Sequence, residues 1–209
     1  PTSQANFSTL RWLNERRFIL NTQTTIGNAF SVITLAPGLE FQTIVGANIY
    51  TQGIREFQGR TLWTNNGYAS STNLRTSFWS IENFLAYRKR FADTHSVVAM
   101  VGTAQQQTDN YTVGTGSNNF PSDFLMFNTL AAGSAGVFNG SSAFREAMNS
   151  YFGRINYSYK DRYLVTFTGR MDGSSKFGAE NKYAFFPSAA VAWRISEEGF
   201  MKRASWLSE

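Results

Sequence analysis

Residues 151–200 decide the fold, and they read YFGRINYSYKDRYLVTFTGRMDGSSKFGAENKYAFFPSAAVAWRISEEGF. Three segments of this stretch alternate with a two-residue period. Apolar and aromatic residues take one set of positions, and small, polar or cationic residues take the other. Because successive side chains of a strand point to opposite faces, the pattern predicts strands at about 151–159, 163–170 and 185–195. Each of these strands has one apolar face.

Two environments produce such strands. A soluble sandwich buries the apolar face, whereas a transmembrane barrel turns it toward lipid and keeps the other face wet. Aromatic residues near the expected strand ends resemble the girdles of a membrane barrel; they are Tyr151, Tyr157, Tyr159, Tyr163 and Trp193. The opposite face carries residues that suit water and are candidates to meet a solute or a plug, namely Arg154, Asn156, Arg170 and Arg194.

Composition excludes several classes of protein. The chain has 209 residues with 16% aromatic and only 16% charged side chains, where about a quarter charged is typical of soluble domains. It has no Cys and one His, so we expect no disulfide, no metal site and no cofactor. The net charge of +5 is spread along the chain, which argues against nucleic-acid binding. No hydrolase, metalloprotease or phosphate-loop motif occurs, so we predict no catalytic residues.

The connections alternate in length along the chain. Further strands are expected at about 18–35, 39–49, 74–91 and 95–107. Short turns near 37–38, 92–94 and 160–161 alternate with longer connections at 52–73, 108–149 and 171–183. Residues 120–130 have helical spacing, with Ser122 or Asp123 as the N-cap. Alternation of this kind is typical of outer-membrane barrels, which have brief turns at one end and long extracellular loops at the other.

The predicted fold class is therefore all-β, with antiparallel up-and-down strands that form part of a large transmembrane β-barrel with long extracellular loops and a short loop helix. No apolar run is long enough for a membrane-spanning helix. Seven strands cannot close a single-chain bacterial barrel, and an open edge in lipid leaves backbone groups unpaired. We expect residues 1–209 to be a partial barrel domain, with the plug and the closing strands lying outside them.

Four motifs in the last third of the chain resemble a known family. They are RINYSYKDRY (154–163), RMDGSSKFG (170–178), FPS (186–188) and WRISEE (193–198). Their order is similar to the late barrel of SusC/RagA-type TonB-dependent outer-membrane transporters. The resemblance implies an outer-membrane, multi-pass barrel that imports oligosaccharides or peptides. It also implies the TonB complex and a SusD-like surface lipoprotein as partners, with the lipid bilayer around the wall.

Two further groups are candidates for contacts outside the wall. Asp172, Ser174 and Ser175 suit either a turn or a ligand site in an extracellular loop, and the turn is the simpler interpretation. Phe124, Met126 and Phe127 either contact the lipoprotein or pack within their own loop. The alternative for the whole chain is a soluble β-sandwich that acts as a carbohydrate-binding or adhesin module.

Overall fold

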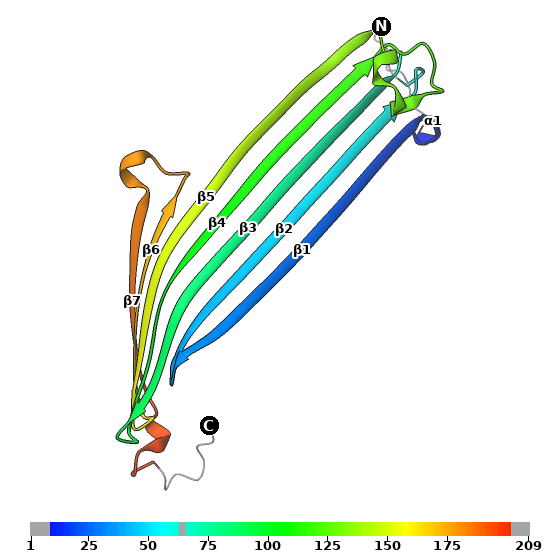
Figure 1. Cartoon of the computed structure of the whole chain (residues 1–209). Helices are drawn as coiled ribbons and strands as arrows, with labels where there is room; N and C mark the ends of the chain where they lie inside the picture. Colours follow the sequence, from blue (N-terminus) through cyan, green and yellow to red (C-terminus); the bar gives the residue numbers. More distant parts are fainter. Residues whose placement is uncertain (1–8, 63–65, 202–209) are drawn as a thin grey trace. The chain divides into compact units, whose positions relative to one another are not determined.

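A computed structural model describes residues 9–62 and 66–201, and these form one seven-stranded sheet in which each strand lies beside its neighbours in the chain (Figure 1). This order confirms the predicted all-β, up-and-down arrangement. The strands are β1 (Arg16–Ala36), β2 (Leu39–Gln58), β3 (Tyr68–Phe91), β4 (His95–Asn118), β5 (Ala135–Tyr159), β6 (Tyr163–Ser174) and β7 (Tyr183–Trp193).

Short helical elements occupy the ends and connections. The helix α1 (Thr9–Glu15) precedes β1. Four 3₁₀ turns follow later: η1 (Met126–Asn128), η2 (Leu130–Ala132), η3 (Ala179–Asn181) and η4 (Ile195–Glu197). None of the helices in the described ranges is long and apolar enough to cross a membrane. The residue pattern favours a helical turn at 197–206, but η4 ends at Glu197 and residues 198–201 form a bend and a turn. Residues 202–206 lie outside the described part.

Most strands are longer than the sequence predicted. Residues 52–58, 68–73, 108–118 and 135–149 were expected to be loops, but they belong to β2, β3, β4 and β5. These segments are rich in Gly, Asn, Ser and Thr and have little apolar alternation. Their backbone groups are paired across the ladder, and that pairing outweighs weak strand propensity. The true connections are correspondingly short, at 59–67, 119–134 and 175–182.

The last three strands have a defined register. Tyr157 lies opposite Val165, which lies opposite Val191, and the ladder continues from Tyr159–Tyr163–Trp193 at one end. Directly opposed residues share one face of a sheet. The two faces predicted from the alternation of β5, β6 and β7 are therefore continuous across these strands. We call the face with Tyr157 and Val165 the apolar face and the one with Asn156 and Thr166 the polar face.

Tight turns join the strands at the short connections. Ala92 and Asp93 after β3, and Lys160 and Asp161 after β5, adopt positive φ of 49°, 50°, 51° and 52°. Consecutive left-handed residues match the twist of antiparallel strands. Gly38 between β1 and β2 also has positive φ, 79°, and a side chain there would clash with the Arg88 carbonyl. The Arg88 N–H donates to the Gly38 carbonyl at 2.7 Å, so this turn requires glycine.

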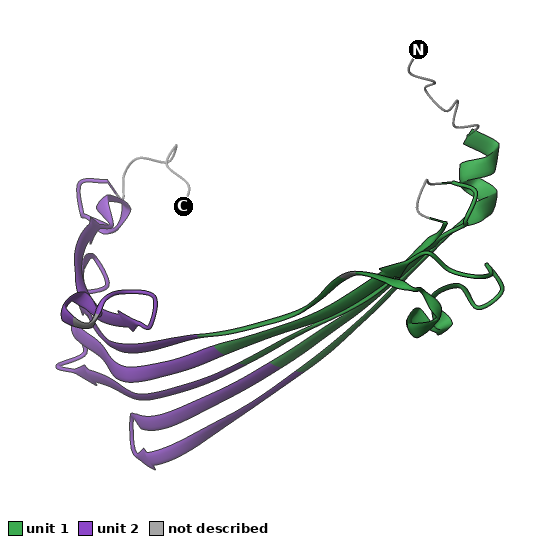
Figure 2. Cartoon of the chain, turned by 90° about the horizontal axis from the view of Figure 1, so that it is seen from above, with its two compact units in different colours: residues 1–26, 48–78, 108–145 green, residues 27–47, 79–107, 146–209 purple. Residues whose placement is uncertain are grey.

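The chain divides into two compact units, coloured separately in Figure 2. Unit 1 comprises residues 1–26, 48–78 and 108–145, and unit 2 comprises residues 27–47, 79–107 and 146–209. Unit 1 holds a small buried cluster of Phe57, Ala69 and Phe120. Within the described residues there is one sheet and no second sheet packed on it. The sandwich alternative, which needs two stacked sheets, does not fit this arrangement.

Candidate functional site

The polar face of β5 and β6 is a hydrogen-bonded surface in unit 2. Asn156 and Thr166 are direct partners in the ladder, and the Thr166 hydroxyl donates to the Asn156 side-chain oxygen at 2.9 Å. Thr168 lies opposite Arg154 on the same face. The structure thus brings together two of the predicted water-facing residues, Arg154 and Asn156, on one side of the sheet.

Arg170 is the most constrained of the predicted arginines. Its Nε donates to both carboxylate oxygens of Asp172, at 2.7 and 2.9 Å, and its Nη2 donates to the Ser150 hydroxyl at 3.0 Å. Ser150 is 1% exposed, and the guanidinium carbon lies 5.8 Å from the Phe152 ring centroid. Several partners fix this guanidinium in one orientation, as pre-organised recognition of a solute requires.

Arg154 and Arg194 differ from Arg170 in having exposed side chains. Neither side chain has a hydrogen-bond or ion-pair partner among the residues the structure describes. Arg154 lies within β5, on the polar face. Arg194 was expected in the last strand, but β7 ends at Trp193 and Arg194 starts the turn η4, with its N–H donating to the Arg162 carbonyl at 2.8 Å.

The Asp172–Ser175 segment is mostly strand rather than loop. Asp172 and Ser174 close β6, and only Ser175 lies in the connection to β7. Asp172 is paired with Arg170, while the Ser174 and Ser175 hydroxyls accept hydrogen bonds from the N–H groups of Lys176 and Ala147, at 3.2 and 2.9 Å. These side chains therefore organise the end of β6, and the turn begins only at Ser175.

The predicted partner-contact residues divide into two groups. Met126 and Phe127 pack against the cluster of Phe57, Ala69 and Phe120, and the Arg55 guanidinium lies 5.1 Å from the Phe127 ring centroid. Phe124 is 86% exposed. The segment is not a capped α-helix as the sequence predicted.

Neither predicted N-cap residue caps a helix in this segment. The Asp123 carboxylate accepts from the Arg60 N–H at 3.2 Å, and Ser122 accepts from the Phe124 N–H at 3.2 Å. Asp123 therefore ties this connection to the one between β2 and β3. The side chains of both residues are engaged with backbone groups, and η1 begins after Leu125 without a side-chain cap.

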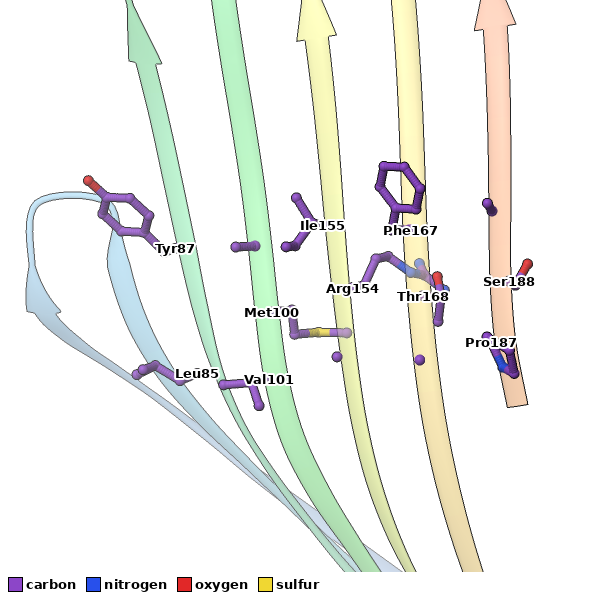
Figure 3. A pocket seen from close by; sticks show the side chains of 14 residues that line it. Leu85, Tyr87, Met100, Val101, Arg154, Ile155, Phe167, Thr168, Pro187 and Ser188 are labelled. Carbon is purple, nitrogen blue, oxygen red and sulfur yellow. The ribbon is translucent and has the colours of Figure 1, made fainter. Parts of the chain in front are cut away.

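The apolar face carries a groove of about 760 Å³ in unit 2, formed by residues of β3 to β7 (Figure 3). Its floor includes Gly153, Gly169 and Pro187, which are opposed across three strands. Larger side chains such as Ile155 and Phe167 stand beside this row (Figure 3). The row of small residues is the reason for the depression, because its neighbours in the ladder project further from the sheet.

An aromatic belt crosses the ends of β3 to β7 in unit 2. Tyr159, Tyr163 and Trp193 follow one another with ring centroids 6.3 Å apart at each step. His95 continues the row, with its ring centroid 5.0 Å from that of Phe91 and its Nδ1 2.7 Å from the Tyr157 hydroxyl. Amphipathic rings in such a row suit a membrane–water interface. Tyr151 does not belong to the belt, because the early start of β5 places it within the strand.

Glu198 joins the belt to the turn that follows β7. Its carboxylate accepts hydrogen bonds from Tyr163 Oη at 2.7 Å, Trp193 Nε1 at 3.2 Å and Arg162 Nη1 at 3.3 Å. The hydrogen bond from Tyr163, followed by that from Trp193, lowers the pKa of Glu198 below its ordinary value of 4.5. Nothing in the local residue pattern around Glu198 indicates this role.

Several residues of these surfaces were not found from the sequence. Ser150, Glu198 and His95 each have a hydrogen-bond partner at least 20 positions away in the chain, so the local residue pattern could not identify these contacts. Among the described residues, no group of three His, Cys, Asp or Glu side chains converges as metal ligands.

Comparison with known proteins gives consistent results. No protein-family profile matches the chain. TonB-dependent receptor P3 of Formosa agariphila is 32% identical over 189 residues, which cover 87% of this chain and 18% of the receptor. TonB-dependent receptor P39 of the same organism is 34% identical over 189 residues, which cover 88% of this chain and 18% of that receptor. TonB-dependent receptor SusC of Bacteroides thetaiotaomicron is 52% identical over 67 residues, which cover 32% of this chain and 7% of that receptor.

Solved structures agree with the fold. The chain resembles the RagAB peptide importer in its "closed-closed" state with a TM-score of 0.86 and 25% identity, over 94% of this chain and 22% of that one. The "open-open" state of that importer gives a TM-score of 0.87 at 24% identity, over 94% of this chain and 22% of the importer chain. The chain thus spans 18% of the length of the first curated relatives it matches. The activity of a whole receptor therefore cannot be assigned to these residues alone.

Proposed function

Because the chain belongs to the SusC/RagA-type family of TonB-dependent outer-membrane receptors, we propose that it builds part of the wall of an importer barrel. The polar face of β5–β7 lines the wet interior, and the apolar face contacts lipid. The two-faced register of β5–β7 carries the proposal. Alternating lipid-facing and interior-facing residues are the hallmark of outer-membrane strands.

The interior wall has fixed and free elements on this assignment. Arg170, held by Asp172 and Ser150, supplies a guanidinium in one orientation. Arg154, exposed on the neighbouring strand, supplies a second one able to follow a passing solute or to contact a plug. Because Asp172 already neutralises Arg170, Arg154 is the cation of this wall that is left to bind polar cargo.

Membership of the family supports a proposal for cargo and partners. We assign oligosaccharides or peptides as cargo, the TonB complex as the energy source, and a SusD-like lipoprotein as a partner that meets the exposed Phe124. Residues 1–209 are then a partial barrel domain, and the plug and closing strands come from the rest of the receptor. Uptake of labelled maltoheptaose and of a labelled peptide, in cells with and without the receptor, distinguishes the two cargo classes. If neither compound is taken up, the cargo assignment is contradicted.

Neighbouring residues of β6 provide the test of the wall. Val165→Arg places a cation on the apolar face and is expected to destabilise the receptor by about 2–4 kcal/mol if the site is near the bilayer centre. Thr166→Arg places the same cation on the polar face, where water solvates it, and is expected to cost well under about 1 kcal/mol. Urea unfolding of the receptor in lipid vesicles measures both.

The two variants control for each other, since they differ by one position in the same strand. A loss of equal size at both positions would contradict the face assignment. So would a larger loss for Thr166→Arg than for Val165→Arg. Retained β-sheet circular dichroism before the urea titration shows that each variant has folded.

A further inference from the structure

A second polar surface lies in unit 1 and is not used by the proposed wall. A hollow of about 710 Å³ crosses β1 to β4 and is lined mainly by amide, hydroxyl and guanidinium groups. Beside it, a hollow of about 430 Å³ extends to β5 and shares two of its lining residues, Arg75 and Tyr111. We call the two together the polar trough; the residues that matter most are Asn21, Gln23, Arg55, Asn73, Arg75 and Tyr111.

The positive charges of the trough are only partly neutralised by carboxylates. Arg145 pairs with Asp109 at 2.5 Å, and this carboxylate is the one acidic group among the lining residues. Arg55 is oriented by the Phe127 ring, 5.1 Å away, and not by an anion. Arg75 is exposed and has no ion pair with any other residue in the described ranges. Two guanidiniums therefore face the hollow without a carboxylate partner.

The uncharged groups around these arginines indicate which anion fits. Asn21, Gln23 and Asn73 are exposed amides, each able to donate and accept hydrogen bonds at once. Tyr111 is 49% exposed and offers a flat ring with a hydroxyl at its tip. Vicinal sugar hydroxyls need such paired donors and acceptors, whereas a guanidinium fork matches a phosphate or carboxylate. Two arginines alone would suit an acidic peptide equally well, so the surrounding amides and Tyr111 are what favour a saccharide.

We propose that the polar trough binds an anionic saccharide, with Arg55 and Arg75 on its phosphate or carboxylate groups and the amides and Tyr111 on its hydroxyls. The hollow of about 710 Å³ has room for a few sugar rings. The proposal depends on unit 1 alone and not on the transport role of the polar face. The anion is either the headgroup of a glycolipid or a free saccharide, and the test separates these sources.

The test measures binding to the full receptor, purified in detergent, by isothermal titration calorimetry at low salt. The probes are a fully deacylated, phosphate-bearing lipopolysaccharide core, intact lipopolysaccharide, neutral maltoheptaose and a hexaglutamate peptide. The double variant Arg55→Gln, Arg75→Gln should raise the Kd for the phosphorylated probe at least about tenfold, since each lost charge-assisted hydrogen bond weakens binding strongly. Arg17→Gln, an exposed arginine of β1 outside the trough, should leave the Kd unchanged.

The outcomes are distinct. Arginine-dependent binding of the deacylated core identifies a free saccharide site, and arginine-dependent binding of intact lipopolysaccharide only identifies a glycolipid headgroup site; both support the proposal. Equal binding of maltoheptaose and the phosphorylated core, tighter binding of hexaglutamate, or equal losses for Arg17→Gln and the double variant would each overturn it. Circular dichroism of the variants confirms folding, and cargo uptake is followed separately.

Discussion

At the scale of single residues, glycines and aromatic rings are paired across strands. Gly173 in β6 lies opposite Tyr183 in β7, and the ring covers it so closely that an added Cβ would lie 2.7 Å from Tyr183 Cζ. Phe138 covers Gly114 in the same manner in unit 1. A ring laid over glycine shields the backbone and compensates for the missing side chain. Such pairs make glycine a packing residue in these strands.

Gly173→Ala should therefore displace the Tyr183 ring and destabilise the receptor by about 1–3 kcal/mol, the usual cost of overpacking. Gly153→Ala is the matched control, because its Cβ would meet nothing closer than the Met100 carbonyl oxygen at 3.6 Å. There alanine should stabilise by about 0.5–1 kcal/mol. Urea unfolding measures both changes. Gly173→Ala combined with Tyr183→Ala should cost less than the sum of the single changes, and strict additivity would contradict the ring-over-glycine explanation.

At the scale of elements, the connection between β4 and β5 combines an anchored side and a free side. Met126 and Phe127 are held by the cluster around Phe57, and Asp123 fixes the segment to the Arg60 N–H. Phe124 projects from this anchored segment with 86% of its surface exposed. A rigidly mounted, exposed aromatic residue loses little conformational entropy on binding and is favoured at interface hot spots.

If the proposed SusD-like lipoprotein binds at this connection, Phe124→Ser should weaken its association with the receptor about tenfold, the loss of a single hot spot. Leu10→Ser is the control, since Leu10 in α1 is also highly exposed, at 74%. Co-purification from membranes and surface plasmon resonance measure the association. A loss no greater for Phe124→Ser than for Leu10→Ser would exclude this connection from the lipoprotein interface. Thermal unfolding of both variants should match the parent, because neither residue is buried.

At the scale of the whole molecule, the sheet has two open edges and an exposed apolar face. Nearly every residue of β1 and all residues of β7 are exposed, and Val191 on the apolar face is 82% exposed. Unpaired strand edges cost several kcal/mol per backbone group in lipid and promote association in water. These features fit a segment of a barrel whose remaining strands lie elsewhere in the receptor.

The 209-residue chain expressed by itself should therefore partition into detergent and associate or aggregate when detergent is removed. Analytical ultracentrifugation with and without detergent measures this behaviour. A monodisperse, detergent-free monomer that unfolds cooperatively would contradict the partial-barrel assignment. The full receptor, in which we propose that both edges are paired, is the control and should remain monodisperse in the same detergent.

The faces of the last three strands, the short turns and the family could be predicted from local sequence. The alternation of 151–195 identified the two faces of β5–β7, including Tyr157 and Val165 on one and Asn156 and Thr166 on the other, because a two-residue period is a local property of a strand. The short turns at Gly38 and Lys160–Asp161 were equally readable, because positive φ favours particular residues. The order of the late motifs indicated the family, which the relatives confirm.

What only the tertiary structure decided depends on neighbours in space. The polar ends of β2, β4 and β5 are strands because adjacent strands pair their backbone groups, although no apolar pattern marks them. Ser150 meets Arg170, Glu198 meets Tyr163, and Arg55 and Arg75 meet around one hollow, through registers that join distant parts of the chain. A residue pattern specifies which way a side chain points, and pairing between strands determines what it meets.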